Sequence, residues 1–133
     1  MNSMGIRVRF KGSYDEALAA LVEALKSEGF GVLTEIDIRD TLKKKLGVDF
    51  RRYKILGACN PPLAHRALQA NLDVGLMLPC NVTVYEADDG SVRVSAIDPM
   101  QTVAAQGTPE IVAVAREVRE KLERVMSRLG EVG

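Results

Sequence analysis

The chain has 133 residues, of which 47% are hydrophobic and 27% are charged, and these proportions exclude an intrinsically disordered protein. Its length is that of one ordinary domain, so we expect a single domain over residues 1–133. Eighteen basic residues balance eighteen acidic ones, which leaves no overall field to attract nucleic acid or an anionic membrane surface.

Apolar and basic residues alternate over residues 4–11, which is the period-two pattern of a strand with one buried face. A helix follows and is expected to run to about Glu28. Ser13 and Glu16 have the spacing of a capping box, in which each side chain satisfies a backbone N–H at the start of the helix. Gly29 is placed to end the helix in a left-handed conformation.

A second strand is predicted over Phe30 to Ile36, and a short helix follows it. Asp37 can cap this helix, whose apolar residues recur every four positions as far as Gly47. A third strand is predicted over Tyr53 to Cys59, so the first half of the chain alternates strands with helices.

The pair Asn60-Pro61 is typical of a helix start, because proline loses nothing at a position whose N–H would have no partner. The short helix that begins there is expected to reach Ala70. The clearest hairpin joins strands over residues 76–87 and 91–98. The turn of this hairpin is Asp88-Asp89-Gly90. A last helix is predicted over about residues 110–129.

This order of elements predicts an α+β fold, with a mainly antiparallel sheet covered on one face by the two longer helices. Several motifs in this order resemble a widespread prokaryotic family, the one numbered 302 among the domains of unknown function; they are Gly29-Phe30, Tyr53–Pro61, Gly75–Val82 and Asp98-Pro99. The resemblance implies a single copy of a fold like that of the TATA-binding protein, β-α-β4-α with extra short helices, assembled as dimers. It implies no activity and assigns no catalytic residue.

No stretch approaches the roughly 20 apolar residues that span a bilayer, and the first residues lack the apolar run of a signal peptide. Two cysteines are too few for the disulfide framework of a small secreted domain, so we expect reduced thiols and a cytoplasmic location. The motifs GxGxxG, GxxxxGK[ST], HExxH and GxSxG are absent. The sequence therefore predicts no cofactor and no membrane partner.

Two Cys-Asn pairs, each close to a proline, are the most conspicuous polar feature of the sequence. The leading hypothesis is a homodimeric binding module whose cleft holds a small ligand or a partner segment, because pockets commonly form where such residues meet at strand ends. The cleft is expected to lie between the Cys59-Asn60-Pro61 corner, the Leu78–Asn81 strand segment and the Asp98-Pro99 strand end. The candidate ligand-binding residues are Cys59, Asn60, Pro79, Cys80, Asn81 and Asp98.

A thiol-redox or metal-dependent enzyme is the alternative, in which Cys59, Cys80 and the only histidine, His65, supply a nucleophile and base or a set of metal ligands. A Cys thiolate would attack an electrophile or exchange with a disulfide, and His65 would accept its proton. The pattern favours packing and predicts no metal site, because Cys80 shares a strand face with Val82 and Val84 and no CxxC unit occurs. A third possibility is that dimerisation is itself the function.

Asn60 and Asn81 also have structural interpretations, as the cap of the following helix and as a link from one strand to its neighbour. Asp98 can serve as a general base, although an Asp-Pro pair is a frequent strand terminator. A basic patch on the uncovered sheet face would suggest nucleic-acid binding, but aromatic residues are few and a solvated or dimer-facing surface is favoured. Its members would be Arg7, Arg9, Lys11, Lys54 and Arg93.

Overall fold

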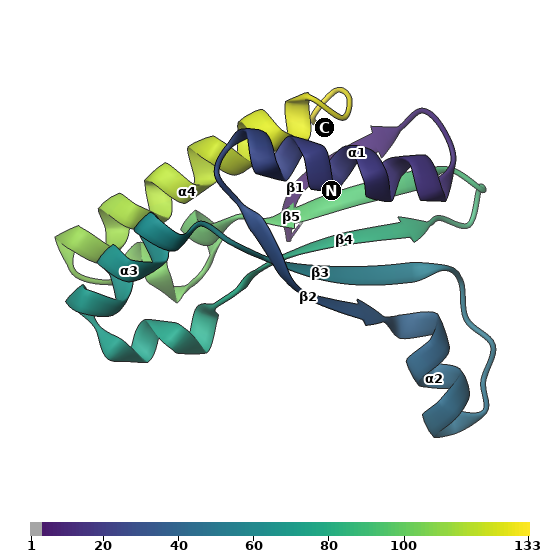
Figure 1. The fold of residues 1–133 in the computed structure, drawn as a ribbon, viewed down its shortest axis with the longest axis horizontal. Helices are drawn as coiled ribbons and strands as arrows, with labels where there is room; N and C mark the ends of the chain where they lie inside the picture. Colours follow the sequence, from purple (N-terminus) through teal and green to yellow (C-terminus); the bar gives the residue numbers. More distant parts are fainter. Residues whose placement is uncertain (1–3) are drawn as a thin grey trace.

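Five strands form one antiparallel sheet, in the order β1-β5-β4-β3-β2, in a computed structural model that describes residues 4–133 (Figure 1). The strands β2 to β5 lie side by side in sequence order, and β1 pairs with β5 at the edge opposite β2. The strands are β1 (Gly5–Phe10), β2 (Gly31–Asp37), β3 (Tyr53–Cys59), β4 (Cys80–Glu86) and β5 (Val92–Ile97).

Two long helices, α1 (Tyr14–Ser27) and α4 (Pro109–Ser127), cover one face of this sheet (Figure 1). The alternation along β5 places Val92, Val94 and Ala96 beneath the helices, and all three are buried. The fold is therefore α+β with a helix-covered antiparallel sheet, in the predicted order β-α-β4-α with extra short helices.

The helix-boundary signals of the sequence are confirmed. The Ser13 backbone N–H donates to Glu16 Oε1 at 2.8 Å, and the Glu16 backbone N–H donates to Ser13 Oγ at 3.0 Å, which completes the capping box. Asp37 Oδ1 accepts from the Asp40 N–H at 2.9 Å and starts the helix α2 (Ile38–Leu46). Gly47 ends that helix with a φ of 68°.

The predicted strand over residues 76–87 is wrong in its first part, because β4 begins only at Cys80. Residues Leu72–Met77 form the 3₁₀ helix η1, whose start is capped when Asn71 Oδ1 accepts from the Asp73 N–H at 2.9 Å. Pro79 has no N–H to give to the ladder, and β4 lies between two other strands, so the strand cannot extend through it. The peptide bond between Leu78 and Pro79 is cis.

A group of short helices gathers at the end of the sheet where β3 stops and β4 starts (Figure 1). Helix α3 (Pro61–Ala70) contacts both η1 and α4. After β5, the chain forms two short 3₁₀ helices, η2 (Pro99–Gln101) and η3 (Val103–Gln106), which the sequence pattern did not predict. Both contact α4, so four short segments and one long helix surround this end of the sheet.

Helix α2 extends away from the layer formed by α1 and α4 (Figure 1). It has no buried residue, and Leu46 near its end is 68% exposed. None of the helices described within residues 4–133 combines the length and the apolar composition needed to cross a bilayer.

Candidate functional site

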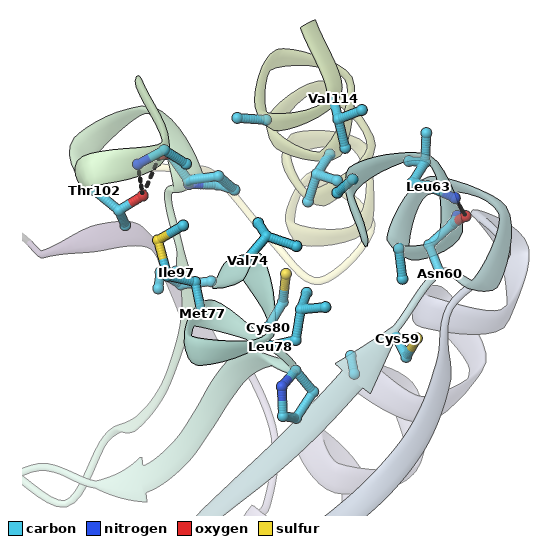
Figure 2. A pocket seen from close by; sticks show the side chains of 18 of the residues that line it. Cys59, Asn60, Leu63, Val74, Met77, Leu78, Cys80, Ile97, Thr102 and Val114 are labelled. Carbon is cyan, nitrogen blue, oxygen red and sulfur yellow. Dashed lines mark hydrogen bonds between the residues drawn. The ribbon is translucent and has the colours of Figure 1, made fainter. Parts of the chain in front are cut away.

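A cavity of about 360 Å³ lies among α3, η1, η3, the first half of α4 and the adjoining ends of β3 and β4 (Figure 2). No charged residue lines it. The lining comprises Phe30, Ala58, Cys59, Asn60, Leu63, Ala64, Ala67, Val74, Leu76, Met77, Leu78, Pro79, Cys80, Asn81, Ile97, Pro99, Thr102, Ala104, Ile111, Val114, Ala115 and Val118.

Asn60 fixes the wall of the cavity that α3 provides. Its Oδ1 accepts from the Leu63 N–H at 3.4 Å and caps α3, as the sequence predicts, while its Nδ2 donates to the Glu28 carbonyl oxygen at 3.1 Å. The side chain, only 8% exposed, therefore ties the start of α3 to the end of α1. Gly29 leaves room for it, because a Cβ at Gly29 would lie 3.1 Å from Asn60 Nδ2.

Gly57 allows the Leu78–Pro79 segment to lie close against β3. A Cβ at Gly57 would overlap Thr34 Oγ1 and would stand 2.6 Å from Pro79 Cγ. Only the absence of a side chain permits this approach, so Gly57 sets the path by which the chain passes from η1 into β4. The glycine thereby positions Pro79, Cys80 and Asn81 at the cavity.

Asp98 supports the cavity from outside its lining. Its Oδ1 accepts from the Met100 N–H at 2.9 Å and starts η2, and its Oδ2 accepts from Arg119 Nε at 3.0 Å. The Asp98 side chain is only 7% exposed, and both of its oxygens bond to groups within the fold. Pro99, the next residue, lines the cavity, whereas Asp98 connects η2 to α4 and does not.

The two cysteines lie on neighbouring strands but on opposite faces of the sheet. Cys80 is paired with Ala58, whose side chain is in the core, and Cys59 is the next residue along β3. Cys80 is directed into the cavity, whereas Cys59 turns away from it (Figure 2). Burial, and to a smaller extent the nearby Cys59, raises the pKa of the Cys80 thiol to about 11. The Cys80 thiol is therefore protonated at neutral pH.

His65 does not join the two cysteines at the cavity. It is exposed on α3 and is absent from the lining, whereas Leu63, Ala64 and Ala67 on the same helix face inward. Among residues 4–133, no three His, Cys, Asp or Glu side chains are placed to hold a metal ion. The structure thus brings together all the predicted site residues except Asp98, but it leaves His65 apart from them.

The opening of the cavity lies where its lining reaches the surface. Leu76 on η1 and Asn81 on β4 are the exposed members of the lining, and Leu76 is 88% exposed. Asn81 alternates with Cys80 along β4, so its amide faces away from the core. The predicted link from Asn81 to a neighbouring strand is not among the side-chain hydrogen bonds of residues 4–133.

Residues from α4 complete the cavity, and sequence reasoning missed them as site residues. Ile111, Val114, Ala115 and Val118 line it, although the sequence pattern predicted only a helix here and assigned it no part in the site. An apolar stripe has the same spacing whether it faces packed side chains or a cavity. Only the arrangement of the short helices distinguishes the two.

The predicted basic patch is wrong for Lys54. Lys54 is paired with Val84 in the sheet, so it lies on the helix-covered side, where its Nζ is 2.8 Å from Glu35 Oε1. Arg9 and Arg93 do lie opposite each other on the uncovered face. Both are within 4 Å of Asp89 Oδ2, at 3.5 Å and 3.7 Å, and this shared carboxylate offsets part of the basic charge of that face.

The family model described as "Domain of unknown function DUF302" matches residues 6–129. One similar solved structure is described as the crystal structure of an uncharacterized conserved protein DUF302 from Bacillus stearothermophilus. It is 32% identical in sequence, with a TM-score of 0.87, and the match covers 96% of this chain and 99% of that chain. No curated protein matches the chain.

Proposed function

The chain belongs to the DUF302 family of domains of unknown function, and because that description states no activity, we propose a function from the cavity itself. The protein is a homodimeric binding module that holds a small ligand between α3, α4 and η1. One observation carries this proposal. The cavity of about 360 Å³ has a lining without charge and falls within the range of roughly 300–1,000 Å³ typical of ligand pockets.

A small molecule suits this cavity better than a segment of a partner protein. The walls come from separate elements of one chain, and only Leu76 and Asn81 of the lining are exposed. An extended peptide needs a long open groove or a free sheet edge, whereas an apolar cavity walled by separate elements of one chain suits a compact ligand. The hydrogen bonds of Asn60 and Asp98 hold the walls in place, which reduces the ordering cost of binding.

The observations favour binding over thiol chemistry. A reactive cysteine needs a thiolate, and therefore a pKa lowered toward neutrality by a neighbouring cation or a helix N-terminus. The pKa of Cys80 is shifted the other way, to about 11, and the only histidine is not at the cavity. We therefore assign Cys80 the role of a neutral, polarizable part of the wall.

A second copy of the chain would cover α2 and the edge strand β2. Neither element contains a buried residue, and a helix of nine residues with little tertiary packing is marginal in water. These two elements and the loop after α2 also carry five exposed apolar side chains, and exposed apolar surface favours an interface. The members, which we call the edge cluster, are Leu33, Ile36, Leu46, Val48 and Phe50.

We also propose a cytoplasmic location. Both cysteines are free thiols, and reducing compartments maintain thiols in that state. Fractionation of the native host's cells, followed by immunodetection of the protein, tests this location.

The proposed binding is tested by native mass spectrometry of freshly purified, untagged protein, together with a thermal-shift screen of neutral and charged small molecules. A retained mass or a raised melting temperature should be lost in Ala64→Leu, which fills the cavity from α3. Ala113→Leu on the exposed face of α4 is the matched control and should behave as wild type. A screen in which no compound stabilises the protein, with no retained mass, would refute the proposal.

A further inference from the structure

We infer that the cavity accepts an uncharged aliphatic ligand, and that any polar end of this ligand stays at the solvent-exposed opening beside Leu76, which we call the mouth. The inference rests on the proposed function and names the class of ligand for the same site. The cavity of about 360 Å³ equals the volume of about a dozen water molecules at roughly 30 Å³ each. The aliphatic body should therefore have about a dozen non-hydrogen atoms.

The polar groups inside the cavity already have partners within the fold. Asn60 uses its amide nitrogen on Glu28 and its amide oxygen on Leu63. Thr102 donates its hydroxyl to the Pro99 carbonyl oxygen at 2.7 Å and accepts from the Ala104 N–H at 3.2 Å (Figure 2). Among the described residues, no buried side-chain nitrogen or oxygen lacks a partner. Both of these polar side chains thus already form hydrogen bonds within the fold, which leaves few groups to pair with a polar part of a ligand.

The interior also has no charge to pair with a charged ligand. No Asp, Glu, Lys, Arg or His lines the cavity. Asp98, which supports the cavity from outside its lining, is already paired with Arg119 at 3.0 Å. Cys80 presents a protonated thiol, which is a weak donor. A carboxylate or ammonium group buried here would lose its hydration without a counter-charge, which strongly disfavours binding.

The cavity meets solvent beside Leu76, which lines it and is 88% exposed. A polar group at this opening can stay hydrated and needs no partner from the protein. A ligand with an aliphatic body and a hydroxyl or ester end can therefore place its body inside and leave the polar end hydrated.

Two probes of equal length test this inference by isothermal titration calorimetry. 1-Decanol buries its chain and keeps its hydroxyl at the mouth, whereas decane-1,10-diol must bury one hydroxyl without a partner. We expect decanol to bind at least about tenfold more tightly, because an unsatisfied buried hydroxyl is costly. Ala64→Leu should weaken decanol binding by about tenfold or more through the volume it fills, and Ala113→Leu should not. Circular dichroism of both variants verifies that they fold.

Equal affinities for the two probes would overturn the inference, as would decanol binding that survives in Ala64→Leu. The thermal-shift screen tests the proposed binding function separately. A charged compound that binds wild type but not Ala64→Leu refutes the aliphatic class and leaves the binding function standing. Failure of every compound, decanol included, refutes both.

Discussion

Raising the pH from about 8 to about 10 is expected to destabilise the protein through the buried thiol of Cys80. The pKa of this thiol rises from 9.0 to about 11 on folding, mainly through burial. Between these two pKa values the unfolded chain has released a proton that the folded chain still holds. Fewer protons are then bound to the unfolded state, so the free energy of unfolding falls as the pH rises. This stability is complete below about pH 9 and is lost as the pH rises toward about 11.

The size of the loss follows from the two pKa values. At about pH 10 the unfolded thiol is one unit above its pKa and the folded thiol is one unit below, which corresponds to about 1.4 kcal/mol. The pKa of Tyr14, raised by burial from 10.0 to about 12, adds a smaller loss in the same direction. Variants separate the two contributions, because only the first disappears when Cys80 is replaced.

Urea unfolding followed by far-ultraviolet circular dichroism measures this loss at the two pH values. Between pH 8 and pH 10, the free energy of unfolding of wild type and of Cys59→Ala should each fall by about 1.4 kcal/mol more than that of Cys80→Ala. The comparison uses the change with pH within each protein, so the packing cost of Cys80→Ala cancels. If Cys80→Ala loses as much stability as wild type, the thiol is not the titrating group and the assignment of a buried, protonated Cys80 is wrong.

Three further predictions concern the cavity walls and the proposed dimer. Gly57→Ala should lower the free energy of unfolding by about 1–3 kcal/mol through its clash with Pro79. Gly31→Ala is the control and should not lower it, because the added Cβ meets nothing within 4 Å. Chemical denaturation measures both variants. Asn60→Ala should cost about 2 kcal/mol by the same measurement, because it removes a helix cap and a second hydrogen bond. Leu46→Lys in the edge cluster should convert the dimer to a monomer in sedimentation-velocity runs. Leu72→Lys, at a leucine that is also exposed but lies outside the edge cluster, should leave it dimeric.

Much of the fold could be predicted because its signals are local. The capping box at Ser13 and Glu16, the cap at Asn60 and the glycine of the hairpin turn each act within a few residues. The alternation of β5 likewise reports a single buried face. Local signals failed over residues 76–79, which were predicted to begin a strand, because the 3₁₀ helix capped by Asn71 extends to Met77 and β4 begins only at Cys80.

The candidate site was predictable in its polar members and not in its apolar ones. Cys59, Asn60, Cys80 and Asn81 stand out in the sequence, and their strands prove to be neighbours. Which cysteine faces the cavity depends on register, since a shift of one residue exchanges the two faces of a strand. Asp98 stood out equally, but its two oxygens bond to Met100 and Arg119, a partner 21 positions away that no local pattern indicates.

The apolar lining of the cavity gives a further reason to expect an occupant. The cavity is open to solvent beside Leu76, which is 88% exposed, so its apolar lining faces water when no ligand is bound. Covering apolar surface contributes about 25 cal/mol per Å². Asn60 and Thr102 already form hydrogen bonds within the fold, so an aliphatic ligand covers the lining without needing polar partners. Adding such a ligand should therefore raise the melting temperature of the protein.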